Sequence, residues 1–288
     1  MAKEQGQRDA RRSPTIRQSL QEYGRGIVGG LLFSLPLLYT MEVWWTGFIA
    51  SPMRLIAALG GTFLLLLGYN RFAGLRKDSR FSEVAIDSLE ELGLGLALSA
   101  FVLWALGRIN WQMPPEEFVG KIVVEALLVA IGVSVGTAQL GDAEDSDDHG
   151  MGEDRDEPGF WGNLVLAVCG AVLVGANVAP TEEVVRLAIE NSSLRLLALV
   201  LVSLVLTGVI LHYLEFRHGK ALPAEGRFRT VVVETGIAYA AALVVSAVTL
   251  AFFNRFDGVS SIIAVALIVV LALPATLGAS AGRLLLRG

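Results

Sequence analysis

The sequence predicts an all-α polytopic membrane protein, with eight transmembrane helices arranged as two similar four-helix halves. Of the 288 residues, 53% are hydrophobic and 18% are charged, whereas soluble domains carry about 25% charged residues. The mean hydropathy is +0.58. Apolar runs of about 20 residues, long enough to cross a bilayer, recur along the chain. Two short segments of the first half also return in the second half.

The predicted organisation follows from these runs. A basic tail (1–25) precedes the first membrane repeat (26–138), and an acidic cytoplasmic linker (139–159) joins it to the second repeat (160–288). The expected spans cover residues 26–48, 53–72, 82–107, 117–138, 160–181, 194–214, 229–253 and 259–285.

The placement of positive charge predicts the orientation. Most of the 23 Lys and Arg residues fall in the tail and in alternate connections, and such residues favour the cytoplasmic side. Both termini are therefore expected in the cytoplasm, with the chain in the inner (plasma) membrane. The first apolar run leads directly into another, which favours a signal anchor over a cleaved leader.

The first internal similarity pairs two membrane acids. The segment FSEVAIDS, which begins at Phe81, aligns without a gap with FRTVVVET, which begins at Phe228. The alignment places Asp87 opposite Glu234. Both acids lie inside predicted spans, where an ionisable group is costly and is a functional candidate.

The second similarity pairs two further acids. The segment TMEV, at residues 40–43, aligns with TEEV, at residues 181–184, and so places Glu42 opposite Glu183. An arginine follows each of these glutamates by the same interval, at Arg54 and Arg195. Halves with four spans each enter the membrane in the same direction, so the sequence predicts a parallel repeat.

Two pairs of carboxylates are thus candidate ion or proton sites. Glu42 and Glu183 are expected near the outer face, where Arg54 and Arg195 could tune their charge. Structural Glu–Arg pairs at the headgroup boundary are the alternative. Asp87 and Glu234 are expected toward the inner face. Glu91 lies one turn beyond Asp87 on the same helix face, and its carboxylate could assist.

A simpler interpretation is open for the inner acids as well. Glu83, Asp87, Glu90 and Glu91 could be solvated at the inner interface, opposite nearby basic residues. On the fourth span, Lys121 and Glu125 are spaced by one turn and are expected to neutralise each other.

Several classes of function lack their signature. The sequence contains no P-loop, no GxSxG, no HExxH and no CxxC pair. An enzyme is therefore not expected, nor is a cofactor, and the metal that the acids could bind is left open. The basic tail fits contact with anionic lipid better than with nucleic acid. Small-xxx-small pairs such as Gly132 and Gly136 permit close helix contact and leave a homo-oligomer open.

Two segments carry a resemblance to a known family: FSLPLLYTMEVWW (33–45) and the acidic face of IDSLEEL (86–92). They resemble segments of a bacterial family of integral membrane proteins that has no assigned activity. The resemblance runs from about Gly26 onward and implies a multi-span inner-membrane protein, without a substrate or site residues. The prediction from the residues is a transporter or channel for protons or small cations. A non-transporting membrane scaffold or sensor, acting through the acidic linker, is the alternative.

Overall fold

The computed structural model describes residues 16–73, 80–139, 159–217 and 224–285. This part of the chain is helical and contains no strand. Its ten helices are α2 (Ile16–Leu38), α3 (Met41–Ile49), α4 (Pro52–Ala73), α5 (Phe81–Ala105), α6 (Pro115–Gln139), α7 (Phe160–Val178), α8 (Glu182–Glu190), α9 (Ser193–Arg217), α10 (Ala224–Phe252) and α11 (Ser261–Leu285).

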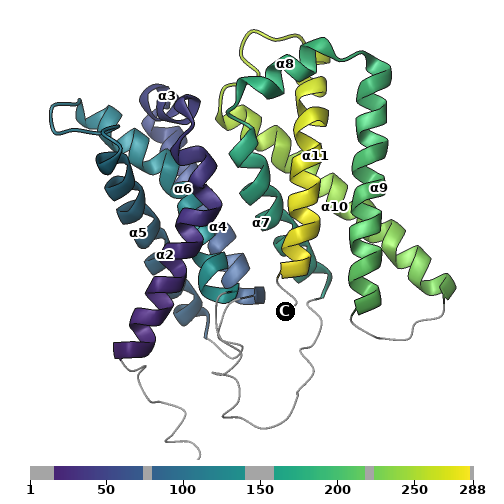
Figure 1. Ribbon diagram of the computed structural model, residues 1–288, viewed down its shortest axis with the longest axis horizontal. Helices are drawn as coiled ribbons and strands as arrows, with labels where there is room; N and C mark the ends of the chain where they lie inside the picture. Colours follow the sequence, from purple (N-terminus) through teal and green to yellow (C-terminus); the bar gives the residue numbers. More distant parts are fainter. Residues whose placement is uncertain (1–15, 74–79, 140–158, 218–223, 286–288) are drawn as a thin grey trace, which may run out of the picture.

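The helices form two units that stand side by side (Figure 1). The first unit contains α2 to α6 and the second contains α7 to α11. In the first unit α6 packs against every other helix, and in the second unit α11 does the same. Each unit is therefore built around its last helix.

The units meet mainly through α7, which packs against α2, α4 and α6. The short helices α3 and α8 lie at one end of the bundle, which we call the short-helix end (Figure 1). At the other end α2 and α7 begin and α6 and α11 finish; we call it the linker end.

Six helices of the described part are long and apolar enough to cross a membrane: α4, α6, α7, α9, α10 and α11. The bent pair α2–α3 raises this number to seven if it counts as one crossing. Helix α5, which carries four acidic residues, is not among them. Eight crossings would require both α5 and the bent pair, so the eight-span arrangement stays a prediction.

The first predicted span, 26–48, is not one straight helix. Helix α2 ends at Leu38, and the angle between α2 and α3 is 87°. Pro36 lies in the last turn of α2 and cannot continue the backbone hydrogen bonds. The Thr40 hydroxyl donates to the Pro36 carbonyl oxygen at 2.6 Å and helps to satisfy the helix end. Glu42 therefore lies in the first turn of α3, and not deep in a crossing helix.

The second unit has the same break at the same relative place. Helix α7 ends at Val178, Pro180 follows, and Thr181 precedes a short helix of nine residues, as Thr40 does in the first unit. The Thr181 hydroxyl donates to the Val178 carbonyl oxygen at 2.8 Å.

The ends of α5 and α10 also share one backbone geometry. After α5, the amide of Gly107 donates to Trp104 and that of Arg108 donates to Leu103. After α10, the amide of Asn254 donates to Ala251 and that of Arg255 to Leu250. Gly107 and Asn254 both have positive φ, at 68° and 57°. These are two Schellman caps, in which glycine or asparagine adopts the left-handed conformation.

Glycines allow the same close crossing in both units. A methyl group at Gly29 of α2 would strike the backbone of Gly132 and Gly136 on α6. A methyl group at Gly170 of α7 would strike the backbone of Gly278 and Gly282 on α11. Small residues let two membrane helices approach closely. One pair of helices in each unit, α2–α6 and α7–α11, therefore packs with its backbones close together.

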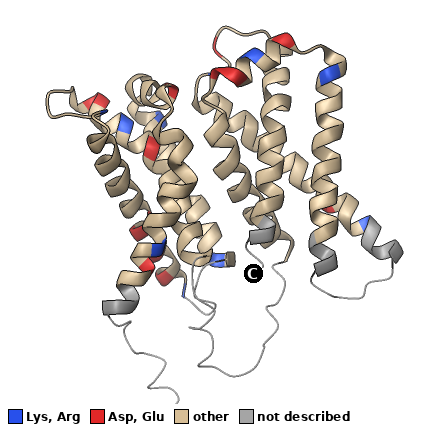
Figure 2. Cartoon of the chain, viewed as in Figure 1, with Lys and Arg blue, Asp and Glu red and all other residues tan. Residues whose placement is uncertain are grey.

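Charged side chains gather toward the two ends of the bundle, and the middle of the helices is mostly free of them (Figure 2). Apolar side chains cover the outside: on α9, for example, Leu197, Leu201, Val205 and Val209 are exposed. This surface fits contact with a lipid bilayer.

Candidate functional site

The predicted outer acids lie at the short-helix end, on separate units. Glu42 is half-buried in the first turn of α3, and Glu183 is exposed in the first turn of α8. Neither forms an ion pair within the described ranges of the chain. Acids in a first helical turn are stabilised by the helix dipole without any transport role. The structure does not join this pair into one site.

The two arginines predicted to tune these acids have other surroundings. Arg54 donates through Nη1 to Oδ1 of Asn254, which follows α10. Arg54 therefore links the two units at the short-helix end and does not pair with Glu42. Arg195 is exposed.

The predicted inner acids are also on different units. Asp87 lies on α5 and Glu234 on α10; both are half-buried and both interact with other residues. Helix α5 packs against α2, α4 and α6, whereas α10 packs against α7, α9 and α11. The two acids therefore face different sets of helices.

Glu91 belongs to a group of polar side chains on three helices, which we call the polar node: Asn70 of α4, Ser88 and Glu91 of α5, and Ser134 of α6. The Asn70 amide nitrogen donates to Glu91 Oε2 at 2.7 Å and to Ser88 Oγ at 3.1 Å. The Ser134 hydroxyl donates to Asn70 Oδ1 at 2.9 Å. One asparagine thus fixes a carboxyl group among three packed helices.

The node lies close to the linker end. Asn70 is in the last turn of α4, and Glu91 follows the start of α5 by ten residues. Asn70, Ser88 and Ser134 are buried and Glu91 is half-buried. Charged and amide side chains within membrane helices are kept where they find partners or line a pathway. The node is therefore the best candidate site among the predicted residues.

Sequence reasoning found Glu91 but missed its three partners. An asparagine in an apolar span is a recognisable signal, and Asn70 could have been singled out. Ser88 and Ser134 carry no such signal, because membrane helices use serine widely. Only the packing of α4, α5 and α6 brings these residues together.

The sequence-based prediction for a fully buried carboxyl group, Glu125, was wrong. Lys121 does not pair with Glu125; its Nζ lies 2.5 Å from Glu117 Oε1, one turn in the other direction. Glu125 has an exposed fraction of 0%, and neither of its oxygens has a hydrogen-bond partner. Spacing alone could not decide between the turn before and the turn after Lys121.

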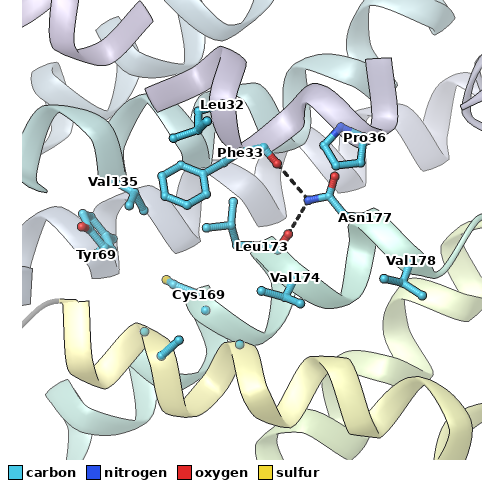
Figure 3. Close-up of a pocket in the computed structure, with 14 residues that line it drawn as sticks. Leu32, Phe33, Pro36, Tyr69, Val135, Cys169, Leu173, Val174, Asn177 and Val178 are labelled. Atoms are coloured by element: carbon cyan, nitrogen blue, oxygen red, sulfur yellow. Dashed lines mark hydrogen bonds between the residues drawn. The ribbon is translucent and has the colours of Figure 1, made fainter. Parts of the chain in front are cut away.

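A cavity of about 410 Å³ lies where the two units meet. Figure 3 shows Phe33 and Pro36 of α2 facing Leu173 and Asn177 of α7 across it. The Asn177 amide donates to the carbonyl oxygens of Phe33 at 3.0 Å and Leu173 at 2.5 Å. The walls of the cavity are otherwise mostly apolar, and none of the residues that line it is acidic. The carboxylates thus do not converge on this cavity.

No cluster of three or more acidic, histidine or cysteine side chains that could hold a metal ion is found in the described ranges. The acidic linker lies almost wholly outside these ranges, since residues 140–158 are not described. The single cysteine, Cys169, is buried and free.

Comparison with known proteins gives the family. Residues 22–286 match the family described as "Putative integral membrane protein (DUF2391)". The match covers most of the chain, so the chain belongs to this family. No solved structure matches it.

A shorter similarity is to a serine palmitoyltransferase of Bacteroides thetaiotaomicron. The two are 33% identical over 99 residues, which is 34% of this chain and 25% of that protein. The chain thus spans about a quarter of the length of this relative.

Proposed function

We propose that this member of the family moves protons or small cations across the membrane, and that Glu91 in the polar node is the site that binds them. The observation that carries the proposal is the hydrogen-bonded position of the Glu91 carboxyl group among α4, α5 and α6. Its oxygens, with those of Asn70 and the two serines, are the kind of ligand that protons and hard cations take.

We also propose that the two units are copies of one ancestral unit, inserted in the same direction. The paired helix breaks, the paired Schellman caps and the paired glycine crossings support this proposal. So does the packing, because α6 and α11 have corresponding neighbours in every case.

The second unit lacks the carboxyl and the amide members of the node. The alignment of Asp87 with Glu234 places Ala238 opposite Glu91, and that of Arg54 with Arg195 places Leu211 opposite Asn70. Ala238 and Leu211 are buried, like Asn70. The second unit thus packs at this level without a carboxyl group or an amide. We therefore assign ion binding at this level to the first unit.

The two acids that both units keep, Asp87 and Glu234, remain part of the proposal. Both lie toward the linker end, one turn from the level of the node. There they would attract cations to the linker end of each unit. Glu42 and Glu183 would act in the same way at the short-helix end, with no joint site required.

The test is transport by the purified protein in proteoliposomes that contain a pH-sensitive dye. With an imposed pH or cation gradient, we expect Glu91→Gln to reduce flux at least tenfold relative to the wild type. Glu90→Gln is the matched control, because Glu90 is the preceding residue of α5 and is exposed. Its flux should stay within twofold of the wild type. Equal flux in the wild type and Glu91→Gln would refute the assignment.

A further inference from the structure

Glu125 is a buried carboxyl group that the proposed function has not used. It lies on α6, and its exposed fraction is 0%. Both of its oxygens lack a hydrogen-bond partner. A buried polar group without partners costs free energy, so its presence needs an explanation.

Packing does not provide that explanation. Helices α6 and α11 have 25 residues each, and Glu125 and Leu271 are the eleventh residue of their helices. Leu271 is equally buried, with an exposed fraction of 0%. An apolar side chain therefore fits the corresponding place, and the carboxyl group is not needed to fill it.

The indole of Trp44 on α3 lies near the Glu125 carboxyl group, outside hydrogen-bond geometry. Its Nε1 is also buried and without a hydrogen-bond partner. Helix α3 is held against α6 by a close contact between Gly47 and Gly120, where an added methyl group would strike the opposite backbone. The packing of the two backbones thus holds the helix that carries Trp44 against the helix that carries Glu125.

The charged groups at this end are engaged elsewhere. Lys121 pairs with Glu117, and its Nζ also lies 3.4 Å from the Arg108 carbonyl oxygen. The Arg108 guanidinium lies over the Trp44 ring, 4.7 Å from its centroid. On the neighbouring helices, Arg54 of α4 donates to Asn254 and Glu42 lies in the first turn of α3.

A further unpartnered atom lies at the same level. Gly95 of α5 packs against Ala130 of α6, and the two helices run in opposite directions. Four residues further along α5 is Ser99, which therefore lies opposite Ala126, next to Glu125. Ser99 is buried and its hydroxyl has no partner. The Gly95–Ala130 contact lies between the polar node and the level of Ser99 and Glu125.

We infer that Glu125 is a second proton-binding site, at the short-helix end of the first unit, and that Trp44 covers it. A metal ion would require several oxygen ligands, whereas a proton requires one carboxylate oxygen. Glu125 and Ser134 are nine positions apart, which places Glu125 about 13 Å along α6 from the node, at 1.5 Å per residue. The inference rests on the proposed function and names the proton as the transported ion.

Labelling with dicyclohexylcarbodiimide tests the site itself. The O–H of a carboxylic acid in apolar surroundings adds across a C=N bond of this reagent, and the adduct rearranges to a stable acylurea. In proteoliposomes we expect mass spectrometry to find the adduct on Glu125 and not on the exposed Glu116 of the same helix. Labelling should fall as the pH is raised. A Glu125 that stays unlabelled at every pH overturns the inference.

Measurements of proton flux in variants distinguish this inference from the proposed function. We expect Glu125→Leu, which copies Leu271, to fold with an unchanged elution profile and to lose at least tenfold in proton flux. Glu116→Gln should stay within twofold of the wild type. If Glu91→Gln loses flux and Glu125→Leu keeps it, the second site is wrong and the proposed function stands. If the wild type carries no flux, both fall.

The role of Trp44 in covering Glu125 is tested by a separate labelling experiment. We expect Trp44→Ala to raise the rate at which a water-soluble carbodiimide labels Glu125 at least fivefold. Trp45→Ala, whose side chain is exposed on the same helix, should leave the rate unchanged. Equal rates in the two variants would contradict the role of Trp44.

Discussion

Asn70 is the side chain on which the polar node depends. Its amide nitrogen holds Glu91, and its amide oxygen accepts from Ser134. Its exposed fraction is 9%, so water provides little replacement for these bonds. Loss of one partner leaves the other buried without a hydrogen bond, which typically costs about 1–3 kcal/mol.

This arrangement predicts coupling between Asn70 and Glu91. Asn70→Leu and Glu91→Ala each copy the second unit, which has Leu211 and Ala238 in the corresponding places. We expect Asn70→Leu to lower the melting temperature, because Glu91 loses its donor. The double variant should recover part of the loss, with a coupling free energy of about 1 kcal/mol. A double-mutant cycle of thermal unfolding in detergent measures it; strictly additive effects would show that the two side chains do not act together.

At the scale of helices, the close contacts between backbones set the shape of each unit. Gly29 meets Gly132 and Gly136, and Gly170 meets Gly278 and Gly282. Overpacking of a tight contact typically costs about 1–3 kcal/mol. Gly60 of α4, in contrast, has open space where a side chain would go.

We therefore expect Gly29→Ala and Gly170→Ala to lower the melting temperature by similar amounts, because each forces apart the same kind of crossing. Gly60→Ala should leave it unchanged or raise it slightly, since alanine is the better helix former. Thermal unfolding of the three variants in one detergent provides the comparison. A large effect at Gly170 with none at Gly29 would argue against equivalent units.

The helix positions were predictable, because apolar runs of the right length mark them. The predicted spans 53–72 and 117–138 correspond to α4 and α6 within two residues. The break after α2 was not predicted. Residues 39–48 are as apolar as the preceding helix, and composition cannot tell a crossing helix from one that lies across the end of a bundle. Pro36 is a recognisable helix breaker, but the direction of the chain after it depends on the packing of α3 against α6.

The site was predictable only in part, for a related reason. Acids in apolar runs stand out, and Glu91 was found in this way. Asn70 and Ser134 are 64 residues apart, and their contact follows from helix packing alone. The partner of Lys121 was misjudged because both neighbouring turns offer a glutamate.

At the scale of the whole molecule, two units of similar build carry different chemistry. Both keep an acid toward the linker end, at Asp87 and Glu234, but only the first has the carboxyl and amide of the node and the carboxyl of Glu125. The cavity between the units has no acidic lining. Transport would therefore pass through the first unit, and not along the seam.

This arrangement predicts unequal effects of the two paired acids. We expect Asp87→Asn to reduce flux strongly, because Asp87 lies one turn from Glu91 on α5. Glu234→Gln should reduce flux less, since its unit lacks the node. Both variants should express and purify as the wild type does. If neither substitution changes flux in proteoliposomes, the acids at the linker end have no part in transport.

The central claim is that charge crosses the membrane through this protein. Its most direct measurement is the current recorded when proteoliposomes on a solid support meet a step in pH. We expect a transient current that grows with the size of the step and with the amount of protein. A response no larger than that of protein-free liposomes, from folded protein, would contradict the account.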